Sequence, residues 1–298
     1  MSFDKPTRNR LAKFVSDARG VIADEFTEQF QSLYGISAKG DIAPLDKLGH
    51  LDDAGLATAA LLRERIDYLE KTHPDDKDGT RAAVARLARE QAFTILNRLA
   101  AIRMAEKRGL IVESVGQGYQ SRGFKVFETV AGSALGDTYH RYRRYLFCLF
   151  DELAIDLGVL FDRRSPQALL FPREPALEKL IRHHDPTKPE KTGLLNQPDL
   201  EPLWAEDETI GWIYQYYNDP EERKKMRKES AAPRNSRELA VRNQFFTPRY
   251  VVEFLTDNTL GRIWYEMVQG RTGLKDQCRY LVRRPTEVFL GPGESAPE

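Results

Sequence analysis

The sequence predicts a mainly α-helical, multihelical fold, and three observations support this prediction. Several long segments carry apolar residues at the three- and four-residue spacing of an amphipathic helix. The chain shows no strict alternation of strand and helix that would indicate a parallel sheet, and no unit repeats at a fixed period. Hydrophobic residues make up 41% of the chain and charged residues 30%, which is typical of helices with solvated outer faces around a core.

The N-terminal third of the chain predicts three long helices. Gly35 and Gly109 follow the first and third of them and are natural C-caps, because glycine adopts the left-handed conformation at little cost. Thr80 can cap the start of the third helix with its hydroxyl. Apolar residues keep the helical period most clearly in the third helix. The three helices are expected at about residues 8–34, 51–71 and 80–108.

The middle of the chain predicts loops and two further helices. Residues 110–137 carry five glycines and predict a loop with short extended pieces, in which Val126-Phe127 can form a small strand. A long helix is expected at about 137–157. From 163 to 206, short apolar runs alternate with Pro, Asp and Gly, as in connecting segments. Residues 207–217 predict a compact, largely buried helix.

Composition and charge exclude several classes of protein. The chain of 298 residues is long enough for one large domain or two, and its formal net charge is zero. This balance excludes a generally basic nucleic-acid binder but leaves room for a local basic patch. Two cysteines, Cys148 and Cys278, do not make a disulfide framework. The N-terminus lacks an apolar signal core, and three acidic residues interrupt the apolar stretch 145–161. We therefore expect a cytoplasmic protein that does not enter a membrane.

The segment Asn243–Val252 joins a pair of phenylalanines to the start of a helix. Thr247 can serve as its N-cap, and Pro248 suits the first helical position. A helix N-terminus presents free N–H groups and a partial positive charge, which suit a carboxylate or phosphate. On the residues alone, a capped core helix with two packed phenylalanines is the alternative. One face is expected to be buried, because apolar residues recur at helical spacing: Val251, Phe254, Leu255, Asn258, Ile263, Trp264 and Met267.

Two basic segments are candidates for contact with DNA phosphates. Residues 219–242 contain eight Lys or Arg against five Asp or Glu, and either a solvated, partly mobile linker or a phosphate contact explains this composition. Residues 139–145 mix cations and tyrosines, so Arg141 and Arg144 can contact phosphates while a tyrosine stacks on a base. The alternative there is a partly buried helix whose cations reach solvent. The phosphate-contact candidates of the first segment are Arg223, Lys224, Lys225, Arg227 and Lys228.

Two further clusters carry residue types that are used in other chemistry. His183-His184-Asp185 has metal-ligand residue types, but no cysteine or further histidine lies at a suitable spacing, so no metal site is expected. Arg98, Arg103 and Glu106 lie among apolar residues of the third helix and predict salt bridges along it. The sequence carries no credible catalytic triad and no phosphate-binding loop.

Taken together, these segments resemble adenine-specific DNA methyltransferases of the gamma type, above all the large phage-defence methyltransferases of the BREX (phage growth limitation) and DISARM systems. Phe245-Phe246-Thr247-Pro248 followed by an apolar helix is similar to the Phe/Tyr-Thr-Pro turn of that family. The resemblance extends over roughly residues 85 to 265, since three further segments follow in the family's order: Ala92–Met104, Leu157–Asp162 with Leu169–Pro172, and Asp207–Tyr217.

The resemblance implies transfer of a methyl group from S-adenosylmethionine to the exocyclic amino group of adenine in double-stranded DNA. The Phe/Tyr-Thr-Pro turn of the family lies beside the methionine end of that cofactor, so the implied cofactor-binding residues are Phe245, Phe246, Thr247 and Pro248. The family's glycine-containing cofactor motif and its Asn/Asp-Pro-Pro-aromatic catalytic loop do not occur in this sequence. No residue is therefore assigned a catalytic role, and the chain by itself is expected to be inactive.

The resemblance also implies an organisation. Residues 1–205 form a helical N-terminal region, 206–242 a helix with a charged linker, and 243–298 the first elements of an α/β methyltransferase domain that this chain does not complete. Residues 291–298 lack core-forming side chains, which is typical of a linker. We expect the N-terminal part of a larger or split enzyme, with DNA, a C-terminal catalytic half or subunit, and other phage-defence proteins as partners. The DNA contacts would come from Arg141, Arg144, Lys224, Lys225 and Lys228.

A second hypothesis comes from another class of protein. The chain can be a non-catalytic helical module that binds DNA or a protein of a defence complex. The two hypotheses differ in the surface they require. An enzyme fragment exposes the apolar face around Val251, Phe254, Leu255 and Trp264 and self-associates, whereas a free-standing module behaves as a monomer or dimer.

Overall fold

A computed structural model describes residues 3–73, 79–132, 134–218, 220–234, 236–243 and 245–284. The prediction of a mainly α, multihelical fold is confirmed. These residues contain no strand, and their one isolated β-bridge pairs Ile36 with Ile42. The chain forms two compact units, a larger one of Pro6–Gln244 and a smaller one of Met1–Lys5 with Phe245–Glu298. The division into 1–205, 206–242 and 243–298 stays a prediction.

The three long N-terminal helices are present. Gly35 and Gly109 adopt left-handed φ angles of 61° and 69°, and both end a helix as expected. The predicted cap at Thr80 is wrong, because the helix already begins at Gly79 and the Thr80 hydroxyl donates to Glu70 at 3.1 Å instead. The loop expected just before this helix lies mostly outside the described residues. The helices are α1 (Lys5–Ser32), α2 (Asp53–Thr72) and α3 (Gly79–Lys107), and a short 3₁₀ turn, η1 (Leu45–Lys47), lies between α1 and α2.

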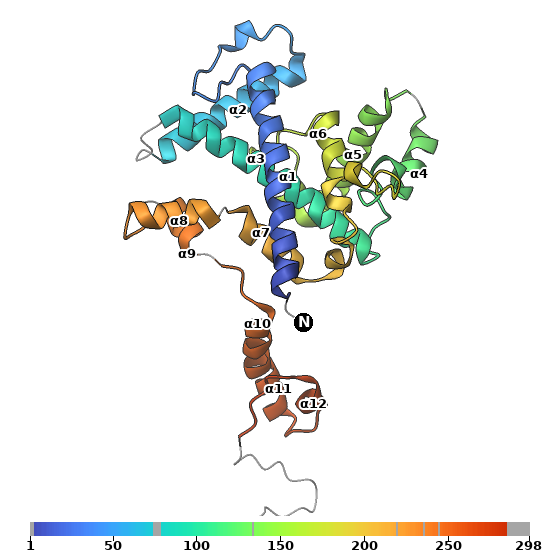
Figure 1. Ribbon diagram of the computed structural model, residues 1–298, viewed down its shortest axis with the longest axis vertical. Coiled ribbons are helices and arrows are strands. Elements are labelled where there is room, and N and C mark those ends of the chain that lie inside the picture. The colour runs from blue at the N-terminus through green and yellow to red at the C-terminus, as the bar shows by residue number, and fades with distance from the viewer. Residues whose placement is uncertain are drawn as a thin grey trace, which may run out of the picture. The chain divides into compact units, whose positions relative to one another are not determined.

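The core of the larger unit is built around α3. In Figure 1, α1 runs through the middle of this unit, with α2 and the start of α3 on one side of it and α4, α5 and α6 on the other. Aromatic contacts join distant elements: Phe14 meets Trp204 edge-on at 5.7 Å, and Phe93 meets Tyr217 at 4.8 Å. Every side of the second half of α3 is covered, since its buried residues include Ile95, Leu96, Arg98, Leu99, Ile102 and Arg103.

The region expected to be loop contains a helix. The small strand predicted at Val126-Phe127 is wrong, because these residues lie in α4 (Arg122–Ala131). The ring of Phe124 is buried edge-on against Tyr142 at 5.0 Å, and Phe127 lies one turn further along on the same side. Two apolar neighbours were too short a pattern to separate a strand from a helix. The 3₁₀ turn η2 (Gly118–Gln120) precedes α4.

The next helix, α5 (Thr138–Phe161), begins where the sequence predicts. The Asp137 carboxylate caps it by accepting a hydrogen bond from the His140 N–H at 2.9 Å. The helix runs four residues beyond its predicted end, through a kink at Leu157 whose φ and ψ are −123° and 46°. The connecting region that follows holds one unexpected helix, α6 (Glu174–Ile181). Three 3₁₀ turns complete this region: η3 (Pro189–Lys191), η4 (Leu194–Asn196) and η5 (Glu201–Ala205).

The larger unit ends in three helices. The compact helix expected at 207–217 is confirmed as α7 (Glu208–Tyr217). The charged segment after it forms two helices, α8 (Pro220–Glu229) and α9 (Ser236–Asn243), which pack against each other. Met226 and Val241 are buried in this pair, in a segment whose composition alone predicts a solvated surface.

The smaller unit is a short helical assembly. A single helical path bends through a π-helical turn, where one extra residue widens the helix. Its elements are α10 (Arg249–Thr256), the π-helical turn η6 (Asp257–Gly261), α11 (Arg262–Met267) and α12 (Leu274–Gln277). The predicted linker at 291–298 lies outside the described residues.

Candidate cofactor and nucleic-acid surfaces

The Phe245–Pro248 segment precedes α10 and has no regular secondary structure. Pro248 has φ and ψ of −58° and 145°, and its carbonyl accepts hydrogen bonds from the N–H groups of Val251 and Val252 at 2.9 and 3.3 Å. Pro248 is therefore the N-cap residue, and helical geometry begins at Arg249. The predicted capping role of Thr247 and the predicted place of Pro248 at the first helical position are both wrong. The helix begins one residue later than the sequence predicts.

The Thr247 hydroxyl does not cap α10. Thr247 is exposed, and within the described residues its side chain makes no hydrogen bond. Phe245 is 56% exposed, so it is not one of two packed phenylalanines in a core. Phe246 is half-buried. An exposed aromatic ring, a hydroxyl and the N-terminus of α10 thus lie within four residues of one another along the chain.

Polar side chains of the π-helical turn hold the returning chain. The Asn258 side chain donates to the Tyr280 carbonyl at 2.7 Å and accepts from the Val282 N–H at 2.8 Å. The Asp257 carboxylate accepts from the Tyr280 N–H at 2.9 Å. Burial and the neighbouring Asp257 carboxylate raise the pKa of Cys278. These contacts fix the shape of the smaller unit without any large apolar core.

The apolar face of α10 and α11 is exposed. The sequence predicts that this face is buried, and in this chain that prediction is wrong. Among the described residues of the smaller unit, only Arg262 and Tyr265 are buried. The exposed fractions are 46% for Phe254, 53% for Leu255, 55% for Ile263, 52% for Trp264 and 70% for Met267.

The basic helix α8 presents three lysines to solvent, namely Lys224, Lys225 and Lys228. Arg227 is also exposed and Arg223 is half-buried, but both arginines bond to α9. The Arg223 Nε donates to the Val241 carbonyl at 2.8 Å, and an Arg227 Nη donates to a carbonyl of α9 at 3.1 Å. The two arginines therefore help fix α9 against α8, and the three lysines remain candidates for phosphate contact.

On α5 the cations and tyrosines separate. Arg144 is exposed, whereas Arg141 is largely covered and pairs with Glu128 of α4 at 3.2 Å. The tyrosine side chains face inward rather than toward a base: the Tyr142 hydroxyl donates to the Ser114 carbonyl at 2.8 Å, and that of Tyr139 to the Pro172 carbonyl at 2.9 Å. Burial raises the pKa of Tyr142 well above its usual value. A stacking role for these tyrosines does not fit this geometry.

The salt bridge predicted on α3 is part of a larger network. The Glu106 carboxylate accepts hydrogen bonds from three successive N–H groups of Ser114–Gly116 at 2.5–3.0 Å and pairs with Arg103 at 3.3 Å. Arg103 also donates to the Asn196 side chain at 3.1 Å and pairs with Glu201. Burial raises the pKa of Glu106, although these hydrogen bonds and Arg103 oppose it. The network joins four separate segments and has a structural role.

The described part of the chain shows neither a metal-binding group nor a membrane span. No three His, Cys, Asp or Glu side chains of these residues are arranged to hold a metal ion, and the His184 ring pairs with the Thr192 hydroxyl at 3.0 Å. Of the helices that can be described, none is both long and apolar enough to cross a bilayer.

Comparison with known proteins supports the resemblance carried by these segments. No protein-family model matches the chain. The adenine-specific methyltransferase BrxX of Escherichia coli O9:H4 (strain HS) is 26% identical over 97% of this chain. The adenine-specific methyltransferase PglX of Lacticaseibacillus casei (strain Zhang) is 36% identical over 22% of it. The chain is homologous to the adenine-specific methyltransferases of BREX systems.

The homology covers a part of each relative. The chain spans about a quarter, 24%, of the length of BrxX and 5% of that of PglX. Nearly the whole chain nonetheless takes part in the alignment with BrxX, so both of its units belong to the homologous region. Membership of the DISARM branch of the resemblance stays a prediction.

Proposed function

We propose that the chain is the N-terminal portion of an adenine-specific DNA methyltransferase. The enzyme would belong to a bacterial phage-defence system that resembles restriction–modification. The enzyme transfers a methyl group from S-adenosylmethionine to the amino group of adenine in double-stranded DNA, in the cytoplasm, alongside other phage-defence proteins. The observation that carries this proposal is the 26% identity with BrxX over 97% of the chain.

In this proposal the smaller unit supplies one wall of the cofactor site. The exposed ring of Phe245, half-buried Phe246, the Thr247 hydroxyl and Pro248 border the cofactor. The N-terminus of α10 lies near the cofactor's methionine carboxylate, because the partial positive charge of a helix N-terminus favours an anion. The residues present fit one wall, and the glycine-containing motif of the other wall lies outside this sequence.

The larger unit contacts DNA in this proposal. Lys224, Lys225 and Lys228 form an exposed basic face on α8, and Arg144 is exposed on α5. Arg141 contributes less, because Glu128 already neutralises it. Such contacts position the duplex through its phosphates and carry no sequence information. The target adenine must leave the base stack to reach the cofactor, and the catalytic loop that receives it is not part of this chain.

The exposed apolar face argues against a free-standing binding module. In the described residues of the smaller unit, the phenylalanine, leucine and tryptophan side chains are about half exposed, which leaves too small a core to be stable alone. Packing of this face against the remainder of a methyltransferase domain removes that surface from water. A non-catalytic module would have to bury it against a second copy or a partner protein.

Transfer of tritium-labelled methyl groups from S-adenosylmethionine to unmethylated DNA, with the full-length protein that contains this chain, tests the proposal. We expect N6-methyladenine in the product. Phe246→Ala with Thr247→Ala should weaken cofactor binding at least about tenfold in calorimetry, since 1.4 kcal/mol corresponds to tenfold. Thr256→Ala, at the exposed far end of α10, is the matched control. Unchanged affinity in the double variant contradicts the role of the turn, and unmethylated adenine contradicts the activity.

A further inference from the structure

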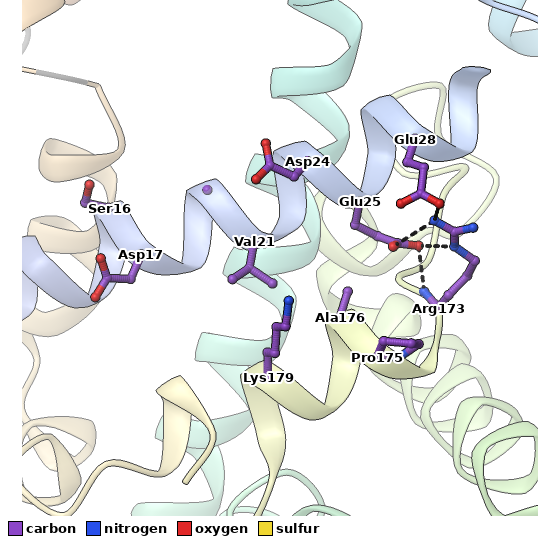
Figure 2. A pocket seen from close by; sticks show the side chains of 11 residues that line it. Ser16, Asp17, Val21, Asp24, Glu25, Glu28, Arg173, Pro175, Ala176 and Lys179 are labelled. Atoms are coloured by element: carbon purple, nitrogen blue, oxygen red, sulfur yellow. Dashed lines mark hydrogen bonds and ion pairs between the residues drawn. The ribbon is translucent and has the colours of Figure 1, made fainter. Parts of the chain in front are cut away.

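An open groove runs between α1 and α6 in the larger unit. Figure 2 shows side chains of α1 and α6 on its two sides. Two adjoining cavities of about 720 and 580 Å³ make up the groove. The two cavities share Asp17 and Val21 of α1 and Pro175 and Lys179 of α6, so they form one continuous groove. No motif of the sequence pointed to this groove, because α6 itself was not expected.

An ion-pair cluster holds the two walls at one end. The buried Glu25 carboxylate accepts from the Arg173 Nε at 2.7 Å and from its backbone N–H at 3.0 Å, and Glu28 pairs with the same guanidinium at 3.0 Å (Figure 2). Gln29 donates to Glu25 at 2.6 Å and to the Phe171 carbonyl at 2.9 Å. These contacts therefore fix the start of α6 to α1 at this end of the groove.

The α1 wall carries a stripe of carboxylates. Asp17, Asp24 and Glu28 are separated by seven and four residues, so they lie on one face of the helix over about 16 Å. Within the described residues, neither Asp17 nor Asp24 makes an ion pair or a side-chain hydrogen bond. The larger cavity is lined by four carboxylates and two cations, Arg173 and Lys179, and is therefore net negative.

The floor between the walls is apolar and has room. Val21, Pro175 and Ala176 line it, and a Cβ atom placed on Gly20 meets no atom within 4 Å. Residues of α1 line the channel at the three- and four-residue spacing at which one helix contacts another. The two walls thus resemble a helix pair that lacks its third helix. Nucleic acid does not suit this site, because the carboxylates repel phosphates.

We propose that the α1–α6 groove docks an α-helical segment of a partner protein. The segment places small apolar residues on Val21 and Ala176 and directs Lys or Arg side chains at Asp17 and Asp24. Recognition follows the helix-in-groove mode, in which the apolar seam supplies affinity and the flanking charges set orientation and partner choice. This site is separate from the proposed methyltransferase chemistry and can stand whether or not that chemistry does.

The probe for this proposal is a fluorescent 18-residue helical peptide with an Ala/Leu seam, Lys along one flank and Gln along the other. Fluorescence anisotropy with the whole chain should give a Kd of about 10 µM, which corresponds to roughly −7 kcal/mol. A peptide with Glu in place of Lys, and a scrambled peptide of the same composition, should bind at least about tenfold more weakly. Equal binding of all three peptides, or no binding of the first, overturns the proposal.

Variants of the protein locate the peptide. Gly20→Leu should weaken binding about tenfold by filling the groove, while the melting temperature stays the same or rises, because leucine favours a helix more than glycine does. Asp17→Lys with Asp24→Lys should have a similar effect by charge reversal. Glu64→Lys, an exposed carboxylate on α2, is the matched control and should bind normally. An unaffected Gly20→Leu variant, or equal loss in Glu64→Lys, overturns the assignment to this groove.

Discussion

The two units of this protein carry the same kind of amphipathic pattern and use it in opposite ways. On α3 of the larger unit, Leu99 and Ile102 are fully buried beneath surrounding elements. On α10 and α11 of the smaller unit, Leu255 and Trp264 occupy equivalent positions in an apolar stripe and are about half exposed. Apolar periodicity therefore identifies the face of a helix that can pack, but burial of that face requires another element to pack against it.

The largest effect is expected where the larger unit buries charge. Glu106→Ala should lower the free energy of unfolding by about 3–5 kcal/mol, because it leaves Arg103 and three backbone N–H groups buried without their acceptor. Asn258→Ala, which removes a side chain that also holds backbone groups, should lower it by only about 1 kcal/mol, because its hydrogen bonds are exposed or only partly buried. Urea unfolding followed by circular dichroism measures both. Similar losses would show that the units do not differ in this way.

Leu99 of the larger unit and Leu255 of the smaller unit allow the same substitution to be compared in the two units. Leu99→Ala should cost about 2–5 kcal/mol, since it opens a cavity in a close-packed core. Leu255→Ala removes the same atoms from a surface that is 53% exposed and should change stability by less than about 0.5 kcal/mol in this chain. In the full-length protein, we expect the Leu255→Ala cost to rise toward that of Leu99→Ala. A cost that stays small there would contradict packing of this face against the rest of the enzyme.

The Glu25 cluster should give the larger unit a measurable pH dependence. Burial favours the neutral acid, but hydrogen bonds from Arg173 and Gln29 outweigh it and lower the pKa of Glu25 below its ordinary value of 4.5. An acid whose pKa is lowered by folding stabilises the fold above its unfolded pKa, and this stabilisation is lost as the pH falls through the folded value. Glu25→Gln should therefore be less stable than wild type at pH 7, with a difference that shrinks below pH 4.5. Thermal unfolding over pH 3–7 measures it, and a constant difference is the contrary result.

The smallest effect is expected at the helix N-termini, where the Asp52 side chain caps α2 and the Thr247 side chain does not cap α10. Asp52→Ala should cost about 1 kcal/mol, because its side chain accepts a hydrogen bond from the Gly55 N–H at 2.7 Å at the start of α2. Thr247→Ala should cost less than about 0.3 kcal/mol, because the Thr247 hydroxyl caps nothing. Thermal unfolding compares the two. A loss of 1 kcal/mol in Thr247→Ala would restore the capping role that the sequence suggested.

The long helices could be predicted because their signals are local. Gly35 and Gly109 end α1 and α3 through the left-handed conformation that glycine adopts readily, and Asp137 starts α5 by bonding to a neighbour three residues away. The same local view failed for α4, α6, α8 and α9. Each has ten residues or fewer and forms where a side chain such as Phe124 or Met226 finds a buried partner elsewhere in the chain.

The candidate surfaces divide in a similar way. The sequence identified the Phe245–Pro248 turn and the exposed lysines of α8, since both depend on residue type and order. It did not show that Arg223 bonds to a carbonyl of α9, because this contact depends on the packing of α9 against α8. Nor could it show that the tyrosines of α5 face inward, since Tyr142 bonds to Ser114, which is 28 residues away.

The helical class, the main helix boundaries and the homology with adenine-specific methyltransferases of BREX systems could be predicted from the sequence alone. These follow from periodicity, caps and motif order, which act over a few residues or survive as a pattern. Which apolar faces are buried and which cations are already paired depend on the tertiary structure. The same is true of the charged groove between α1 and α6. Those outcomes depend on free energies of burial and pairing between residues far apart in the chain, and no local pattern encodes them.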